Sequence, residues 1–210
     1  MRSLSEIDTI VKRASKGVGY SWGIAEEVGK NIKLLETYGL SGLKNLNDYF
    51  NSLKSKKFQH LTHISTENQS KIPYCPIIAG TSFLDQIDEL KDLVNIKIEN
   101  MSYPILFLPF LSRASEIVGK KISLKIDEKI FLLNFNQNIY SNYFANEILK
   151  HADLIQISFR LMIILRIRHP REHFQLEKSH YPKLFHYQLI SRCFLIHHLP
   201  QMYCFRILIL

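Results

Sequence analysis

The N-terminal part of the chain alternates apolar and polar side chains at the spacing of amphipathic helices. Ser3 and Glu6 have the spacing of a capping box, in which two side chains bond free N–H groups at the start of a helix. Apolar residues then recur every three or four positions until residues 17–19, Gly-Val-Gly, end the pattern. Similar patterns cover about 22–38 and 43–53. We therefore expect three helices, and the apolar face of the second comprises Trp22, Ala25, Val28, Ile32 and Leu35.

Beyond residue 72 the spacing changes to that of short strands and short helices. Residues 54–72 are polar and basic without periodicity, and we interpret them as a flexible linker. The segment 75–80 indicates a loop that enters a short helix at about 81–90. Apolar and polar side chains alternate over 93–99, which predicts a strand.

The remaining pattern completes a mixed set of elements. It predicts a buried strand over 103–106, a helix from 109 to 118 that stops at Gly119, a hairpin of strands 122–126 and 129–134, a helix or helical turn over 139–150 and a last strand over 151–158. Helices first, with mixed helices and short strands after them, are typical of an α+β fold. We expect N-terminal helices followed by a small mixed sheet with packed helices.

The chain divides by composition into one domain and a tail. We expect a helical part over 1–53, the linker over 54–72, the α+β part of the same domain over 73–158, and an anomalous basic, histidine-rich tail over 159–210. Six of the nine histidines lie in the tail, and from Arg160 onward it has no Gly, Ala, Val, Asp, Asn or Thr. Turns normally need Gly, Asn or Asp. The composition therefore predicts a poorly ordered tail.

Two explanations of the tail stay open. One hypothesis is an out-of-frame translation of an AT-rich gene that begins near residues 155–162. The other is a genuine C-terminal extension with a biased composition. Resequencing the gene distinguishes them, because one uninterrupted frame with relatives that share the tail contradicts a frameshift.

The formal charge of +8 belongs mainly to the tail and not to the domain. Residues 160–210 hold eight of the 27 Lys and Arg residues and two of the 19 Asp and Glu residues, so they carry six of the eight net charges. The domain is nearly neutral, and its basic residues alternate with acidic ones. Such a surface offers little counterion release to a phosphate backbone, which disfavours a nucleic-acid partner.

No segment predicts export or a membrane span. The N-terminus turns acidic where a signal peptide has its apolar region. The longest apolar run covers 103–111, whereas a membrane helix needs about 20 residues. The cysteines, Cys75, Cys193 and Cys204, form no even disulfide framework. We expect a cytosolic protein in a reducing compartment.

A sequence signature covers the first two predicted helices and the turns after them: Arg13–Gly19, Ser21–Gly29 and Leu35–Gly42. It resembles a bacterial family of uncharacterised proteins, the domain-of-unknown-function family 3726. A looser resemblance continues through Cys75–Gly80 and Leu108–Ala114, so that the whole covers about residues 1–155. The resemblance implies no activity, because none is assigned to the family. It also implies a C-terminal part that contains Gly, Ala, Thr and Asp. The tail of this chain contains none of these four residue types.

The best candidate site lies at the start of the second predicted helix. Trp22 and Glu26 are four residues apart and share a helix face, and Glu27 follows about 100° further round. Lys12 and Arg13 approach them if the first two helices pack as a hairpin. Two carboxylates beside two basic side chains suit the binding of a polar ligand or general acid–base catalysis. In the simpler alternative, Trp22 is core and the glutamates are surface.

Gly23 and Gly29 lie inside the second predicted helix, where each costs about 1 kcal/mol relative to alanine. This cost indicates a close ligand approach or a close helix crossing. The helices and the glycine turn also resemble a helix-turn-helix. Glu26 and Glu27 would then lie in the first turns of the DNA-recognition helix, where carboxylates are unfavourable beside the DNA phosphates. The Gly-Val-Gly turn lacks the strand and the third glycine of a dinucleotide fingerprint.

Other residues with site chemistry lack partners in the sequence. His60 and His63 have no nearby cysteine or carboxylate to complete a metal site. Cys75 precedes a predicted helix, where a thiolate is favoured, but a buried structural cysteine is the better interpretation. In the tail, Cys193, His197, His198 and Cys204 fit no standard zinc spacing. We predict no metal and no cofactor.

The sequence leaves three functions open. The leading prediction is a domain that binds a small molecule or a partner protein. The first alternative is an enzyme with Glu26 or Glu27 as general acid or base, and the second is a DNA-binding regulator. The candidate ligand-binding residues are Trp22, Glu26, Glu27, Lys12 and Arg13.

Overall fold

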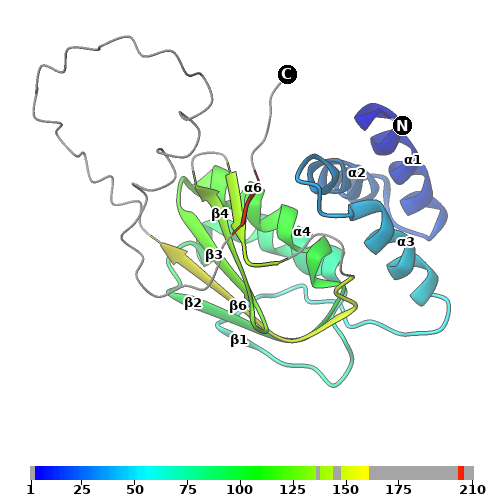
Figure 1. The fold of residues 1–210 in the computed structure, drawn as a ribbon. Coiled ribbons are helices and arrows are strands. Elements are labelled where there is room, and N and C mark those ends of the chain that lie inside the picture. Colours follow the sequence, from blue (N-terminus) through cyan, green and yellow to red (C-terminus); the bar gives the residue numbers. More distant parts are fainter. Residues whose placement is uncertain (1–2, 136–137, 144–147, 161–202, 206–210) are drawn as a thin grey trace, which may run out of the picture. The chain divides into compact units, whose positions relative to one another are not determined.

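A computed structural model describes residues 3–135, 138–143, 148–160 and 203–205 (Figure 1). The chain divides into two units, residues 1–162 with 202–210, and residues 163–201. All described residues belong to the first unit, so the following account concerns that unit alone. Within the described part of the chain, no helix is both long enough and apolar enough to cross a membrane.

Three helices open the unit, as the sequence pattern predicts. They are α1 (Leu4–Gly17), α2 (Trp22–Thr37) and α3 (Gly42–Ser52). The Ser3 hydroxyl accepts a hydrogen bond from the Glu6 amide, and the Glu6 carboxylate accepts one from the Ser3 amide, which confirms the capping box. Gly39 ends α2 with a φ of +72°, a conformation that glycine adopts without strain.

The strands form one mixed sheet in the order β1-β2-β6-β3-β4-β5-β7. They are β1 (Glu67–Asn68), β2 (Asn95–Ser102), β3 (Lys121–Ile126), β4 (Lys129–Phe135), β5 (Asn138–Ser141), β6 (His151–Arg160) and β7 (Tyr203–Phe205). β1 pairs parallel to β2, and the other described pairs are antiparallel. The helices followed by a mixed sheet confirm the α+β prediction.

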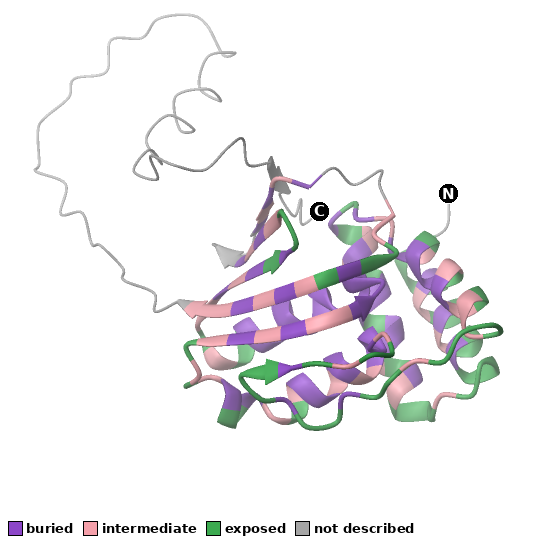
Figure 2. Ribbon diagram, turned by 90° about the horizontal axis from the view of Figure 1, so that it is seen from below, coloured by how far each residue is buried: buried purple, intermediate pink, exposed green. Residues whose placement is uncertain are grey.

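The helices α4 (Pro76–Asp85) and α6 (Leu108–Val118) lie against one face of this sheet (Figure 1). A short helix, α5 (Ile87–Leu90), follows α4. The core between helices and sheet contains fully buried Phe83, Phe107, Phe110 and Phe131. Figure 2 shows the opposite face of β2 and β6, where buried residues alternate with half-buried and exposed ones. One face of the sheet therefore builds the core while the other meets solvent.

Three local predictions need correction. α4 begins at Pro76 instead of residue 81, because the Cys75 thiol caps the helix by accepting the Ile78 amide. Residues 103–106 form no strand: Tyr103 has a φ of +44°, and a 3₁₀ turn, η1, covers Pro104–Leu106. The predicted helix over 139–150 is also wrong, because its first residues pair in β5 and residues 148–150 are not helical, while 144–147 lie outside the described residues.

The segment 54–72, for which the sequence predicts a linker, packs on the domain over part of its length. Leu61 and Ile64 are buried in the common core, and β1 adds to the sheet edge. Asn68 holds this edge, because its side-chain amide donates to the backbone oxygens of Ser65 and Lys97. Isolated apolar residues anchor such a segment without any periodicity, so the pattern of the sequence does not reveal them.

β6 ends at Arg160, in register with Lys121 of β3. The predicted tail begins at this point. Of the tail residues that follow, 203–205 are described and pair with β5. The prediction of poor order for the other tail residues, like the His and Cys positions there, lies outside the described residues.

Candidate functional site

The predicted site residues at the α1–α2 hairpin have different surroundings in the described structure. Lys12 binds Asp8 through an ion pair of 2.7 Å, and that hydrogen bond, with the Asp8 and Glu26 charges, raises the pKa of Lys12 against a smaller opposing effect of burial. Arg13 and Glu26 are exposed. Trp22 is 59% exposed, so its predicted place on the apolar core face is wrong. Its ring lies 5.6 Å from the Lys16 ammonium instead.

Gly23 and Gly29, the two glycines inside α2, differ in what surrounds them. A Cβ atom on Gly29 would lie 2.5 Å from Asp8 Oδ1 and 2.9 Å from Lys12 Cγ, so this glycine allows α1 and α2 to cross closely. A Cβ on Gly23 would meet no described atom within 4 Å. The helix-crossing explanation therefore holds for Gly29 and not for Gly23.

Glu27 points in a different direction from Glu26 and joins α2 to α6. Its carboxylate bonds the Arg113 guanidinium and also the Lys30 ammonium, at 2.8 Å. Arg113 reaches the Asn31 amide oxygen as well, at 3.3 Å. Burial acts to raise the pKa of Glu27, but the bonds from Arg113 and Lys30 outweigh it, and the net pKa lies below the ordinary 4.5. Glu27 is thus held as an anion in a structural network.

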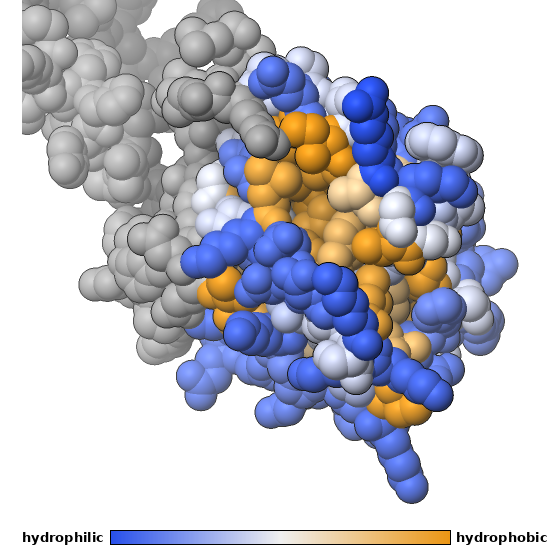
Figure 3. Space-filling model, turned by 90° about the vertical axis from the view of Figure 1, so that its right-hand side faces the viewer, coloured by the Kyte–Doolittle hydropathy of each residue, from blue (hydrophilic) through white to orange (hydrophobic). Residues whose placement is uncertain are grey.

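The side of the molecule formed by α1, α2 and α3 also carries apolar surface between hydrophilic side chains (Figure 3). Leu4 and Ile10 of α1 and Val18 at its C-terminal end are exposed. Nothing in the described structure shows what covers this surface. A partner protein at this face, like the ligand site at Trp22, Glu26, Glu27, Lys12 and Arg13, stays a prediction.

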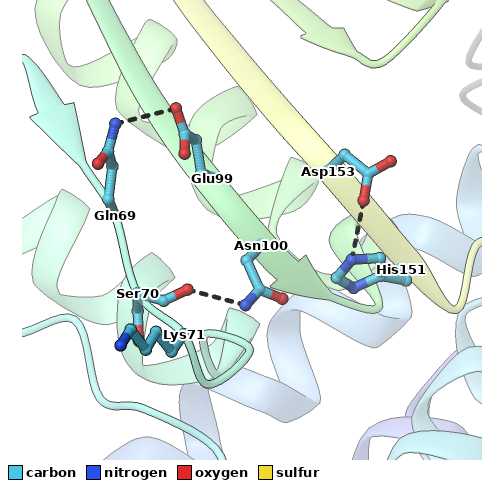
Figure 4. Close-up of a pocket in the computed structure, with 7 residues that line it drawn as sticks. All are labelled: Gln69, Ser70, Lys71, Glu99, Asn100, His151 and Asp153. Carbon is cyan, nitrogen blue, oxygen red and sulfur yellow. Dashed lines mark hydrogen bonds and ion pairs between the residues drawn. The ribbon is translucent and has the colours of Figure 1, made fainter.

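A groove of about 580 Å³ lies elsewhere, where the loop after β1 meets strands β2 and β6 (Figure 4). The loop contributes Gln69, Ser70 and Lys71; β2 contributes Glu99 and Asn100; β6 contributes His151 and Asp153. All seven side chains are polar. None of the five predicted site residues lines this groove.

Asn100 explains how neighbouring residues of one strand line the same groove. In a regular strand, Glu99 and Asn100 would point to opposite faces. Asn100 has a φ of +59°, in the left-handed region that asparagine tolerates better than most residues. The β2–β6 register includes Glu99↔Leu154 and Met101↔Ala152 but skips Asn100, which stands opposite Asp153. The regular alternation is broken here, so Glu99 and Asn100 both reach the groove.

Hydrogen bonds fix most of the groove side chains. The Gln69 amide donates to the Glu99 carboxylate at 3.1 Å, and the Asn100 amide donates to the Ser70 backbone oxygen at 2.8 Å. His151 Nε2 lies 3.2 Å from Asp153 Oδ1. The Tyr74 hydroxyl donates to the Gln69 backbone oxygen, and the Ser70 hydroxyl accepts from the Ile72 amide. The loop is therefore tied to β2 across the groove.

The architecture and the groove define a class: an α+β domain with a polar groove on the solvent face of its sheet. In the comparison with protein families, residues 2–75 match the family described as "Protein of unknown function (DUF3726)". This match confirms the resemblance over those residues, which include Gln69, Ser70 and Lys71. The resemblance over residues 76–155 stays a prediction. No curated protein and no solved structure matches the chain.

Sequence reasoning missed the groove because its residues come from three separated segments. Gln69 to Lys71 belong to the stretch interpreted as a linker. Two signals were present nonetheless. Asparagine is rare inside strands, so Asn100 at the end of a strand pattern indicates a break. His151 and Asp153 are two residues apart in a predicted strand, a spacing that places both side chains on one face.

Proposed function

We propose that this protein binds a small polar molecule in the groove between the loop after β1 and strands β2 and β6. The observation that carries the proposal is the convergence of seven polar side chains around a cavity of about 580 Å³. Pockets for small molecules commonly measure about 300–1,000 Å³, so the volume fits a small ligand. The lining lacks apolar side chains, which favours a hydrophilic ligand.

The position of Asn100 supports a functional groove. A non-glycine residue in the left-handed region costs about 1–3 kcal/mol unless the surroundings hold it, and such residues cluster at binding sites. Asn100 is held by the Ser70 backbone oxygen and by the Tyr74 amide, which donates to the Asn100 backbone oxygen at 2.8 Å. The groove is thus preformed before any ligand arrives.

Backbone-amide NMR of the full chain tests the proposal. A set of small amines, carboxylic acids and sugars at millimolar concentration is added one compound at a time. We expect a binder to shift the amide signals of residues 69–71, 99–100 and 151–153. Trp22 is the single tryptophan of the chain and reports on the other candidate site. Shifts at 12–13 and 22–27, with a change in Trp22 fluorescence, contradict the groove and favour the helical site.

The enzymatic alternative, with Glu26 or Glu27 as general acid or base, is less well supported. A general acid needs a proton to give near the working pH, and the lowered pKa of Glu27 keeps that carboxyl ionised. Glu26 is exposed on α2. The DNA-binding alternative has no further support, since Glu26 is exposed in the first turns of α2.

A further inference from the structure

We infer that the ligand of the groove is a small organic cation that carries an ammonium group. This inference rests on the proposed function and names its ligand class. It follows from an account of which polar atoms in the groove already have partners and which do not.

The Gln69 and Asn100 amides each donate one of their two N–H groups within the groove, and the imidazole is engaged with a carboxylate. The Gln69 amide nitrogen donates to Glu99, and the Asn100 amide nitrogen donates to the Ser70 backbone oxygen. His151 Nε2 is engaged with Asp153. Because the acceptors of the two amides are a carboxylate and a carbonyl oxygen, the orientation of both amides is fixed by their partners.

The two amide oxygens and half of the carboxylate oxygens are left over as acceptors. Within the described residues, the amide oxygens of Gln69 and Asn100 have no hydrogen-bond partner. One carboxylate oxygen of Glu99 and one of Asp153 are likewise without a partner there. The Asp153 side chain is 93% exposed, so its oxygen is accessible from solvent. Four acceptor oxygens, two of them on carboxylates, suit a ligand that donates several hydrogen bonds and carries positive charge.

Donors also remain in the groove, namely the second N–H of each amide, the Ser70 hydroxyl and the Lys71 ammonium, and only the ammonium carries a charge. The Ser70 hydroxyl keeps its proton free to donate, and the Lys71 ammonium has no ion-pair partner among the described residues. Figure 4 shows both residues on the loop, across the groove from His151 and Asp153, with the Lys71 ammonium directed away from Asn100. A bound ammonium group therefore lies toward Glu99, Asn100 and Asp153, and Lys71 repels it weakly from the rim.

An ammonium group also fits better than a metal ion. Within the described part of the chain, no group of three or more His, Cys, Asp or Glu residues gathers closely enough to hold a metal. Calcium takes six to eight oxygen ligands, more than these four free oxygens supply. An ammonium needs only about three acceptors, one for each N–H. The acceptor count therefore selects an organic cation.

The experiment is an NMR titration of the full chain with three four-carbon probes of similar size, n-butylammonium, butyrate and butanol, and with calcium ion. We expect n-butylammonium to shift the amides of residues 99–100 and 151–153 with a dissociation constant on the order of millimolar, which is typical of a ligand with so few atoms. Asp153→Asn and Glu99→Gln should each weaken binding about tenfold, because each removes a charge-assisted acceptor. Unchanged far-UV circular dichroism shows that these variants fold.

Lys71→Gln gives the sharpest control, because its effect changes sign with the ligand class. A cationic ligand predicts about twofold tighter binding, since a repelling charge is gone. Weaker n-butylammonium binding in Lys71→Gln, equal shifts from butanol, or a groove that takes butyrate or calcium and not n-butylammonium would each overturn the cation assignment. Binding of those other probes still leaves a groove that binds small polar molecules. A groove whose amides respond to none of the probes contradicts both the cation assignment and the proposed function.

Discussion

The two faces of the sheet are built from the same strands, yet their side chains have different partners. On the face toward α4 and α6, Ile155 and Ile157 of β6 are buried in the core. At the start of the same strand, His151 and Asp153 meet solvent and line the groove, because the burial alternation of β6 breaks after Asp153, opposite Asn100. Buried apolar packing stabilises the fold, whereas exposed polar pairs contribute little to stability. The comparison indicates that the covered face maintains the fold while the open face is free for binding.

The largest expected effect is a truncation on the covered face. Phe107 is fully buried, and its ring lies edge-on to Phe83 with centroids 5.9 Å apart. Phe107→Ala should lower the free energy of unfolding by about 3–5 kcal/mol, because it removes apolar contacts and leaves a cavity. Urea denaturation measures the loss. Asp153→Asn on the open face is the control and should change stability by less than about 0.5 kcal/mol. Similar losses of unfolding free energy in both variants would contradict the difference between the two faces.

Glycine substitutions test how closely the covering helices pack. A Cβ atom on Gly80 of α4 would overlap the Phe110 ring of α6. Gly80→Ala should cost about 1–3 kcal/mol through overpacking. Gly23→Ala is the matched control, since a Cβ there meets open space within a helix and should stabilise by about 0.5–1 kcal/mol. Equal melting temperatures for the two variants are incompatible with a tight α4–α6 contact.

The adjacent glutamates of α2 should also differ in their contribution to stability, because one is packed against α6 and the other is exposed. Glu27→Gln should lower the free energy of unfolding by about 1–2 kcal/mol at neutral pH, because charge-assisted bonds to Arg113 and Lys30 weaken. Glu26→Gln, one residue away and exposed, should stay within about 0.5 kcal/mol.

The same pair gives a pH dependence with a definite sign. Glu27 has a pKa below its ordinary 4.5, so its contribution is complete above that value and is lost as the pH falls through the lowered pKa. Urea denaturation between pH 7 and pH 3 should therefore show the cost of Glu27→Gln shrinking in acid. A cost that is the same at both ends of this range contradicts the ion-pair explanation.

A smaller effect is expected in the cluster of half-buried Tyr20 with buried Tyr49 and Cys75. The Tyr49 hydroxyl lies 2.9 Å from Cys75 Sγ and 3.1 Å from the Tyr20 hydroxyl. Tyr49→Phe should cost about 0.5–1.5 kcal/mol at neutral pH for the lost bonds. Burial raises the pKa of Tyr49 above its ordinary 10.0, so its contribution is complete below that value and is lost as the pH rises beyond it. The variant should therefore lose less stability than the wild type between pH 9 and pH 11, and an equal loss would contradict burial of the tyrosine.

The sequence predicts the fold well where a local pattern determines it. The capping box at Ser3, the glycine after α2 and the β3–β4 hairpin all follow from neighbouring residues. The pattern fails where distant contacts decide. Leu61 and Ile64 are buried by the rest of the domain, and Tyr103 adopts a left-handed φ that its apolar surroundings do not signal. Such features depend on tertiary packing and leave no periodic trace.

The candidate site shows the same division. Spacing on one helix correctly separates the directions of Glu26 and Glu27, but it cannot show that Arg113, far along the chain, binds Glu27. The groove depends on the break in β2 at Asn100, which brings three distant segments together. For the tail, the change in composition at Arg160 coincides with the end of β6. The frameshift hypothesis for the residues beyond stays a hypothesis that resequencing of the gene tests.

The most direct test of the central claim measures stability and ligand binding together. The free energy of unfolding is measured for the wild type and for the double variant Glu99→Gln/Asp153→Asn, without ligand and with n-butylammonium at about ten times its dissociation constant. The account predicts equal stability without ligand, and a gain of about 1.4 kcal/mol with ligand in the wild type alone. A double variant that is markedly less stable without ligand, or that gains as much as the wild type with it, would contradict the assignment of binding to the open face.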